Sequence, residues 1–159
     1  FGTLRSGIVI IPYLNSHNYW GVDITDKFFD IAKSRLTQDV LTKKFPRFDK
    51  INNKTLLKLK EFNADFLFSD AVAYHIPPFE ICDYIENIKT AMSEKTQSYI
   101  SIRLSRYNSQ ESLMRWSYSE DYISQIIKKN KLKLDIINDP IQEAKNTNNT
   151  RDVFLILKN

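Results

Sequence analysis

The chain has 159 residues, a length that fits one domain with a sizeable core. Its 42% hydrophobic content and its 20 aromatic residues (10 Phe, 8 Tyr, 2 Trp) exclude a disordered chain, and its single Cys excludes a disulfide framework. The net charge is only +4, with Lys and Arg interleaved among Asp and Glu, which disfavours nucleic acid as a partner.

The first third of the chain alternates between helical and extended patterns. An apolar, helix-like run covers residues 7–14, and residues 18–24 predict a buried strand that ends with an acid. Thr25 or Asp26 is expected to cap the helix that follows, in which apolar residues recur at helical spacing. Beyond it, we expect a short strand over 45–51 and a short helix over 55–62.

The remaining elements are more regular. Residues 64–69 are bulky and apolar, which favours a central strand. Pro78 suits the first turn of a helix whose apolar face recurs from residue 81 to 92. Residues 98–104 form the next expected strand, and Ser119 is expected to cap another helix. The last two strands are expected at 132–137 and 152–157.

This order of elements predicts an α/β fold with a mainly parallel sheet and helices on both faces. Because the linker 138–151 is polar and contains Pro140, the last two strands are expected to form an antiparallel pair at one edge. No apolar run approaches the roughly 18 residues that cross a bilayer, so we expect no membrane contact. The sequence carries no signal for oligomeric state.

Ligands of open α/β sheets bind beyond the carboxyl ends of the strands. Gly2 would let the backbone approach a ligand before the helix-like run, and Asp23 ends a strand where a carboxylate can accept both hydroxyls of a ribose. An Asp in this position is also a common helix cap, so both interpretations stay open.

The segment 1–36, which contains Gly2 and Asp23, resembles the first half of a class I S-adenosylmethionine-dependent methyltransferase. The resemblance continues through the His-Ile-Pro-Pro segment at 75–78 to the last strand. It implies a Rossmann-like fold and a single methyltransferase-like domain over 1–159, truncated at the N-terminus so that the family's first strand is missing; Phe1 stands at the variable position of a glycine loop. The implied cofactor is S-adenosyl-L-methionine. Its implied binding residues are Gly2, Thr3, Asp23, Ile24, Asn52, Asn53, Ser69, Asp70 and Ala71.

Methyl transfer requires the protein to position the acceptor and, for a hydroxyl, to remove its proton. His75 is the better candidate base because it follows a strand at the expected mouth of the site, whereas His17 lies in a turn-like segment. Asp70 is the second catalytic candidate. Both side chains could instead brace their loop, and this alternative stays open.

The acceptor site is expected in the stretch 103–118, which follows a strand end and combines guanidinium groups with aromatic rings. An ordinary exposed loop is the alternative. The candidate acceptor-binding residues are Tyr74, Arg103, Arg106, Tyr107, Arg115 and Trp116.

The sequence therefore predicts a cytoplasmic methyltransferase that methylates an oxygen of a small anionic or sugar-containing acceptor. A non-catalytic methyltransferase-like module that binds a partner is the alternative. Metal-ligand spacings and a Walker phosphate loop are absent, and Cys82 falls inside a predicted helix, so metal, nucleotide-phosphate and thiol chemistry are not expected.

Overall fold

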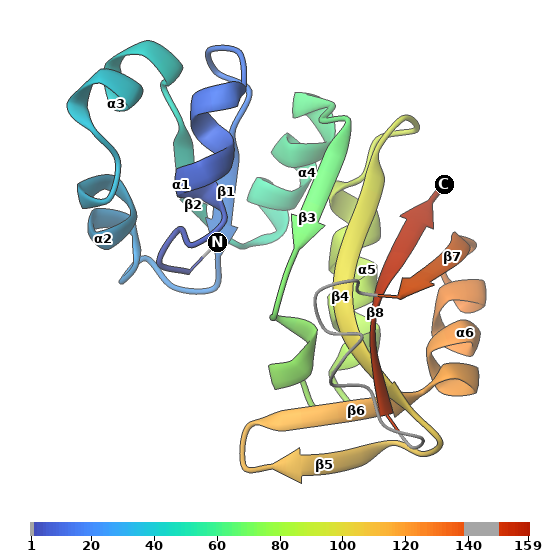
Figure 1. Cartoon of the computed structure of the whole chain (residues 1–159). Helices are drawn as coiled ribbons and strands as arrows, with labels where there is room; N and C mark the ends of the chain where they lie inside the picture. Colours follow the sequence, from blue (N-terminus) through green and yellow to red (C-terminus); the bar gives the residue numbers. More distant parts are fainter. Residues whose placement is uncertain (1, 139–149) are drawn as a thin grey trace. The chain divides into compact units, whose positions relative to one another are not determined.

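The computed structural model describes residues 2–138 and 150–159. The chain divides into two compact units, Phe1–Leu57 and Lys58–Asn159, which we call unit 1 and unit 2 (Figure 1). The single methyltransferase-like domain over 1–159 stays a prediction. The loop position predicted for Phe1, and Pro140 in the polar linker, lie outside the described residues.

Unit 1 is built on two parallel strands, β1 (Trp20–Asp23) and β2 (Arg47–Lys50). Its short helices are α1 (Gly7–Ile10), η1 (Ile11–Tyr13), α2 (Phe29–Ser34) and α3 (Gln38–Lys44); α4 (Asn53–Phe62) begins in unit 1 and ends in unit 2. A small core holds the unit together. Its buried side chains are Leu4, Ile11, Ala32 and Leu36.

The expected cap of α2 is wrong. The Thr25 hydroxyl accepts from the Lys27 N–H at 3.3 Å and the Asp26 carbonyl accepts from the Phe29 N–H at 2.9 Å, so these residues form a turn and the helix begins three residues later. By contrast α3, which the sequence pattern did not predict, has a true cap, because the Thr37 hydroxyl accepts from the Val40 N–H at 3.3 Å.

Unit 2 contains the larger sheet, in which β4 (Gln97–Ser105) is the hub. β4 pairs in parallel with β3 (Phe66–Ser69) and β6 (Arg115–Ser119), and antiparallel with β8 (Thr150–Lys158). β7 (Lys133–Asn138) completes the expected antiparallel pair with β8, and β5 (Ser109–Ser112) forms a hairpin with β6. The mainly parallel α/β architecture with antiparallel closing strands is therefore confirmed.

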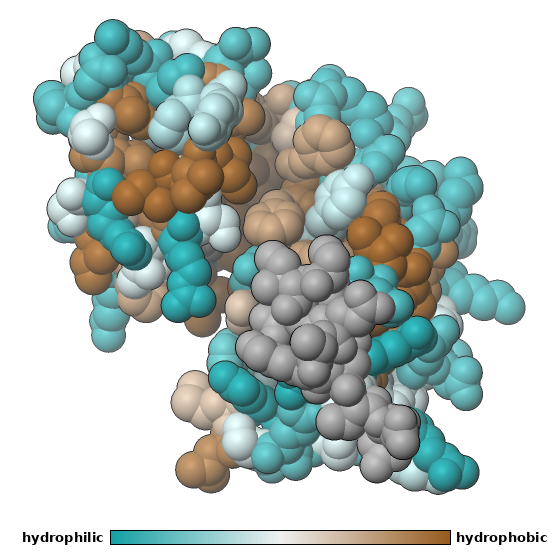
Figure 2. All heavy atoms as spheres, in the orientation of Figure 1, coloured by the Kyte–Doolittle hydropathy of each residue, from teal (hydrophilic) through white to brown (hydrophobic). Residues whose placement is uncertain are grey.

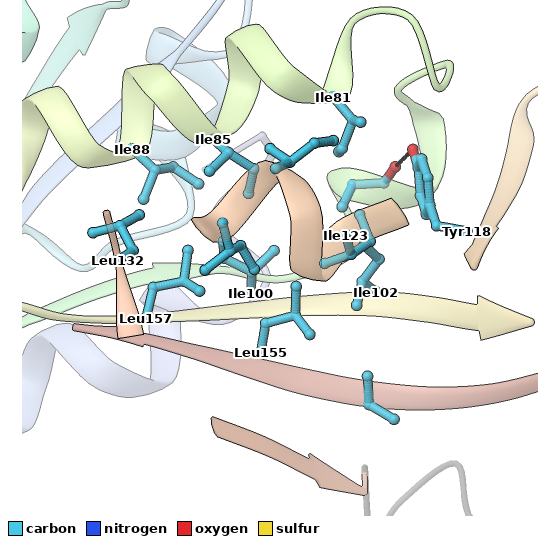
Figure 3. Close-up of a cluster of buried hydrophobic side chains, with 14 of the residues drawn as sticks. Ile81, Ile85, Ile88, Ile100, Ile102, Tyr118, Ile123, Leu132, Leu155 and Leu157 are labelled. Atoms are coloured by element: carbon cyan, nitrogen blue, oxygen red, sulfur yellow. Dashed lines mark hydrogen bonds between the residues drawn. The ribbon is translucent and has the colours of Figure 1, made fainter. Parts of the chain in front are cut away.

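Two helices cover one face of this sheet and form the main core with it (Figure 3). α5 (Ile81–Ala91) buries Ile81, Ile85 and Ile88, as its spacing predicts. α6 (Glu120–Lys129) begins at Ser119, whose hydroxyl accepts from the Tyr122 N–H at 3.2 Å, which confirms the predicted cap. The alternation along β4 and β8 directs their Ile, Leu and Val side chains into this core.

The opposite face of the sheet is aromatic along β3 and polar toward the carboxyl end of β4. Phe66 is 65% exposed and Phe68 51% exposed, and their rings contact Tyr99 and Phe154 respectively. Contrary to its expected central position, β3 pairs only with β4 among the described strands, and its aromatic side chains lie on a face that α5 and α6 do not cover. Toward the carboxyl end of β4 this face becomes polar.

Candidate functional site

In unit 1 the predicted cofactor residues gather at the carboxyl end of β1. The Asp23 carboxylate ends the strand and accepts hydrogen bonds from the Gly2 N–H at 2.9 Å and from the Thr25 N–H at 3.3 Å. Gly2 has φ +50°, the left-handed region that favours glycine. The structure thus joins the loop before α1 to the acid after β1, two segments 21 residues apart.

Thr3 and Ile24, the neighbours of Gly2 and Asp23, differ in their surroundings. The Thr3 carbonyl accepts from the Arg35 guanidinium at 2.8 Å, which ties the same loop to the end of α2. Ile24 follows Asp23 and is 78% exposed. An exposed apolar side chain at a strand end is available to pack against a flat ring.

Asn52 and Asn53 lie where β2 passes into α4. The Asn52 side-chain oxygen accepts from the Thr55 N–H at 2.9 Å, so it caps the start of α4, and its amide donates to the Lys50 carbonyl at 3.3 Å. Asn53 is the first residue of the helix and is exposed. The structure gives Asn52 a local role, and the predicted contact of either Asn with an adenine amino group stays a prediction.

In unit 2 the turn after β3 is held by Ser101 of β4, a buried residue that the sequence analysis missed. Its hydroxyl donates to the Asp70 carboxylate at 2.7 Å and accepts from the Ala71 N–H at 2.7 Å. Ala71 has φ +56°, a strained conformation that these two bonds help to maintain. Ser69, one residue earlier, shares a hydrogen bond of 2.5 Å with the Tyr84 hydroxyl of α5.

Next to this turn lies Tyr74, whose pKa is raised chiefly by burial and further by the charges of Asp152 and Asp70, against lowering contributions from Ser101 and Arg103. The Arg103 guanidinium lies 6.0 Å from the centre of the Tyr74 ring. The structure therefore brings three predicted site residues, Asp70, Tyr74 and Arg103, into one polar cluster around Ser101.

Arg103 is already engaged by two carboxylates. Its guanidinium binds buried Asp152 in two places, at 2.6 and 2.7 Å, and Glu111 at 2.7 Å. These hydrogen bonds raise the pKa of Arg103 despite its partial burial. A cation held in this way connects β4, β5 and β8, a role that the sequence position of Arg103 did not reveal because Asp152 is 49 residues away.

The stretch after β4, which was expected as a loop, is the β5–β6 hairpin. Arg106 lies 5.3 Å from the centre of the Tyr107 ring, and Tyr107 is 65% exposed. Arg115 and Trp116 belong to β6; Arg115 is exposed and Trp116 packs partly against the core of unit 2. The turn carries exposed apolar side chains, visible at the lower left of Figure 2.

His75 is the last residue of the single turn η2 (Ala73–His75). Its ring is exposed, and its Nδ1 lies 2.6 Å from the carbonyl oxygen of Met114 at the hairpin turn. His17, the other imidazole, stacks on Phe45 with ring centres 4.8 Å apart in unit 1. Throughout 2–138 and 150–159, no cluster of His, Cys, Asp and Glu suits a metal ion, and no helix is long and apolar enough to span a membrane.

Comparison with known proteins gives a match in structure only, because no family model and no curated protein sequence matches the chain. Magnesium protoporphyrin IX methyltransferase from Synechocystis PCC 6803 with bound S-adenosylmethionine matches with a TM-score of 0.66 and 15% identity, over 99% of this chain and 66% of that one. An S-adenosylmethionine-dependent methyltransferase from Clostridium acetobutylicum matches with a TM-score of 0.70 and 13% identity, over 99% and 80%.

A third match is described as a pericyclic reaction enzyme, with a TM-score of 0.68 and 12% identity. The chain spans 40% of that protein's length. At these identities the likeness shows the fold, which is the class I methyltransferase fold. A shared fold does not fix the function, which depends on the residues of the site.

Proposed function

We propose that the protein is an S-adenosylmethionine-dependent methyltransferase. The observation that carries the proposal is the Asp23 carboxylate, fixed at the carboxyl end of β1 by the N–H of Gly2, in a chain with the fold of proteins crystallised with this cofactor. A carboxylate offers about four acceptor positions and suits a vicinal diol, so its chemistry fits a ribose.

The cofactor, when bound, supplies an activated methyl group on a sulfonium. In unit 1, Asp23 would accept hydrogen bonds from the ribose hydroxyls, Gly2 and Thr3 would contribute backbone contacts, and Ile24, Asn52 and Asn53 would bind the adenine. In unit 2, Ser69, Asp70 and Ala71 form the turn that Ser101 holds, and the Asp70 carboxylate would suit an amino group as its hydrogen-bond donor. His75 takes the proton of the acceptor hydroxyl on its ring nitrogen Nε2.

Calorimetric titration of S-adenosylmethionine into the full chain and its variants tests the cofactor assignment. Asp23→Ala should weaken binding by roughly 5- to 150-fold, because it leaves the ribose hydroxyls without an acceptor, a loss of about 1–3 kcal/mol. Asp49→Ala is the matched control, since Asp49 is a carboxylate of the neighbouring strand that accepts from the Trp20 indole at 2.9 Å. Equal affinities for all three proteins would remove Asp23 from the site.

Failure of the unsubstituted chain to bind the cofactor would instead favour the alternative function, a methyltransferase-like module that binds a partner. Binding without transfer of an isotopically labelled methyl group to any acceptor would favour it too.

For the acceptor, we propose a small anionic or sugar-containing molecule that is methylated on oxygen. Arg106 and Arg115 are exposed, the Arg106 guanidinium lies over the exposed ring of Tyr107, and Trp116 follows Arg115 in β6. Guanidinium forks bind carboxylate or phosphate through charge-assisted hydrogen bonds. Since the donors of Arg103 already serve Asp152 and Glu111, we assign it to the support of Tyr74 rather than to direct contact.

A panel of carboxylate, phosphate and sugar acceptors, assayed with labelled cofactor over a salt series, tests this assignment. The Michaelis constant of an anionic acceptor should rise with salt, because exposed charges are screened. Arg106→Ala and Arg115→Ala should raise it about tenfold, with little change in kcat. Arg151→Ala is the control, because that surface arginine pairs with Glu120 of α6. Flat salt dependence together with unchanged kinetics would eliminate an anionic acceptor.

A further inference from the structure

The turn of the β5–β6 hairpin is attached to the ring of His75. The carbonyl oxygen of Met114 lies 2.6 Å from Nδ1 of His75, within hydrogen-bond distance. A carbonyl oxygen only accepts hydrogen bonds, so Nδ1 carries the proton. In the neutral imidazole the other nitrogen, Nε2, then holds the lone pair and is the proton acceptor.

A second contact from the same hairpin holds the backbone on both sides of His75. Tyr118 of β6 is fully buried, and its hydroxyl donates to the Ala73 carbonyl at 2.8 Å and also contacts the Ile76 carbonyl. These carbonyls belong to the residues two before and one after His75. Figure 3 shows the Tyr118 ring pointing from its strand toward this segment, with its hydroxyl hydrogen-bonded.

The hairpin itself is anchored at its base and projects at its turn. β6 joins the sheet through its parallel pairing with the end of β4, and the hydroxyls of Ser109 and Ser117 lie 2.8 Å apart between β5 and β6. At the turn, Leu113 is 94% exposed and Met114 is 68% exposed, so burial of these apolar side chains does not hold the turn in place. Through the backbone of this turn, the Met114 carbonyl contacts His75, and the Leu113 carbonyl accepts from the Gln110 side chain of the same hairpin at 3.4 Å.

We infer that the β5–β6 hairpin positions His75: the Met114 carbonyl fixes the ring with its proton on Nδ1, and Tyr118 is a positioning residue that fixes the backbone around it. The inference rests on the proposed function, in which Nε2 of His75 takes the proton of the acceptor. It assigns to the hairpin a task that is separate from binding the acceptor through Arg106 and Arg115.

The tautomer can be measured without any activity. In the full chain labelled with ¹⁵N-histidine, at a pH where the ring is neutral, His75 should show a protonated Nδ1 and an unprotonated Nε2. His17 is the internal reference, and a His75→Asn variant assigns the two rings. A protonated Nε2 on His75 would overturn the inference.

Tyr118→Phe tests whether the Tyr118 hydroxyl fixes the backbone around His75. It should shift the ¹⁵N resonances of His75 toward a mixture of tautomers and lower kcat roughly 10- to 100-fold, with cofactor affinity unchanged. The matched control is Tyr122→Phe, whose hydroxyl donates to the Pro78 carbonyl at 2.6 Å, three residues beyond His75. Resonances in Tyr118→Phe that equal those of the unsubstituted protein would overturn the role of Tyr118.

Should Tyr118→Phe fail to fold, His75→Asn and His75→Gln test whether the β5–β6 hairpin is attached to Nδ1 of His75. The Asn amide can replace Nδ1–H as the donor to Met114, whereas the longer Gln side chain places its amide near the position of Nε2. Hydrogen exchange of the β5–β6 amides should therefore be as slow in His75→Asn as in the unsubstituted protein, and faster in His75→Gln. Equal exchange in the two variants would overturn the inference.

Turnover separates this inference from the proposed function. His75→Asn should lower kcat about 100-fold or more, since it keeps the donor but lacks Nε2. Full turnover in His75→Asn would remove the proton-accepting role of His75 from the proposed function, even where the tautomer is as inferred. A wrong tautomer, at any level of turnover, rejects the hairpin's role.

Discussion

Tyr84 shows how one side chain couples the turn after β3 to pH. Burial raises the pKa of its hydroxyl from 10.0 to about 12, although the hydrogen bond with Ser69 opposes the rise. The folded state therefore binds this proton more tightly than the unfolded state does. The resulting stabilisation is complete below pH 10 and is lost as the pH rises from about 10 to 12.

Tyr84→Phe removes this titration. Between pH 9 and pH 11, the free energy of unfolding of the unsubstituted protein should fall by about 1 kcal/mol more than that of Tyr84→Phe. Urea unfolding at the two pH values measures the difference. Tyr13→Phe is the control, because Tyr13 is 86% exposed and that variant should follow the unsubstituted protein. Parallel curves for Tyr84→Phe and the unsubstituted protein would contradict the prediction.

At the scale of single residues, sequence reasoning succeeds where the deciding partner is local. Ser119 caps α6 through a bond only three residues along the chain, and Asp23 closes its strand as the pattern predicts. It fails where the partner is distant. The pairing of Arg103 with Asp152, and the bond from Ser101 to Asp70, depend on which strands become neighbours, which no local pattern contains.

Between elements, the Arg103–Asp152 pair joins β4 to β8 at directly paired positions. Arg103→Met should destabilise unit 2 by about 3 kcal/mol, because it takes two charged hydrogen bonds from a buried carboxylate. Lys158→Met is the control. Its partner Asp135 belongs to β7, both side chains are exposed, and such surface pairs contribute less than about 1 kcal/mol. Urea unfolding measures the loss of unfolding free energy in both variants. Equal losses would show that the buried pair contributes no more to stability than the surface pair does.

The elements themselves were predicted unevenly for a physical reason. α5, α6, β4 and β8 bury a regular set of apolar side chains, so periodicity reveals them. α3 buries none of its residues, and β5 is exposed throughout with an irregular register to β6, so neither leaves a periodic apolar pattern. The hairpin that contacts His75 was therefore expected as a loop, although its residues were singled out.

On the scale of the whole molecule, the two units differ in how much core they possess. Among the residues that the structure describes, unit 1 buries four apolar side chains in its cluster, whereas unit 2 buries sixteen residues around β4 and β8. Because stability depends on the apolar surface buried, unit 1 should open more readily. Hydrogen exchange should be slowest in β4 and β8, and at least tenfold faster in β1 and β2.

Binding of S-adenosylmethionine to unit 1 should slow exchange there, by about 100-fold at a ligand concentration 100 times Kd. Mass spectrometry of exchanged peptides, with and without the cofactor, measures both effects. Asp23→Ala serves as the control: at the same ligand concentration it should reduce the slowing to about 2- to 20-fold and keep the difference between the units. Equal exchange rates in β1 and β4 without cofactor would contradict the ranking of the two units.

The position of β8 between β4 and β7 has a consequence for the synthesis of the protein. β4 is made about 50 residues before its antiparallel partner, yet the core of unit 2 needs Val153, Leu155 and Leu157. Until residues 150–158 have left the ribosome, β4 and β7 each lack the strand that lies between them, and such unpaired edges invite aggregation. The core of unit 2 therefore cannot close before residues 150–158 have been made, and its nascent chain exposes unpaired strand edges until then.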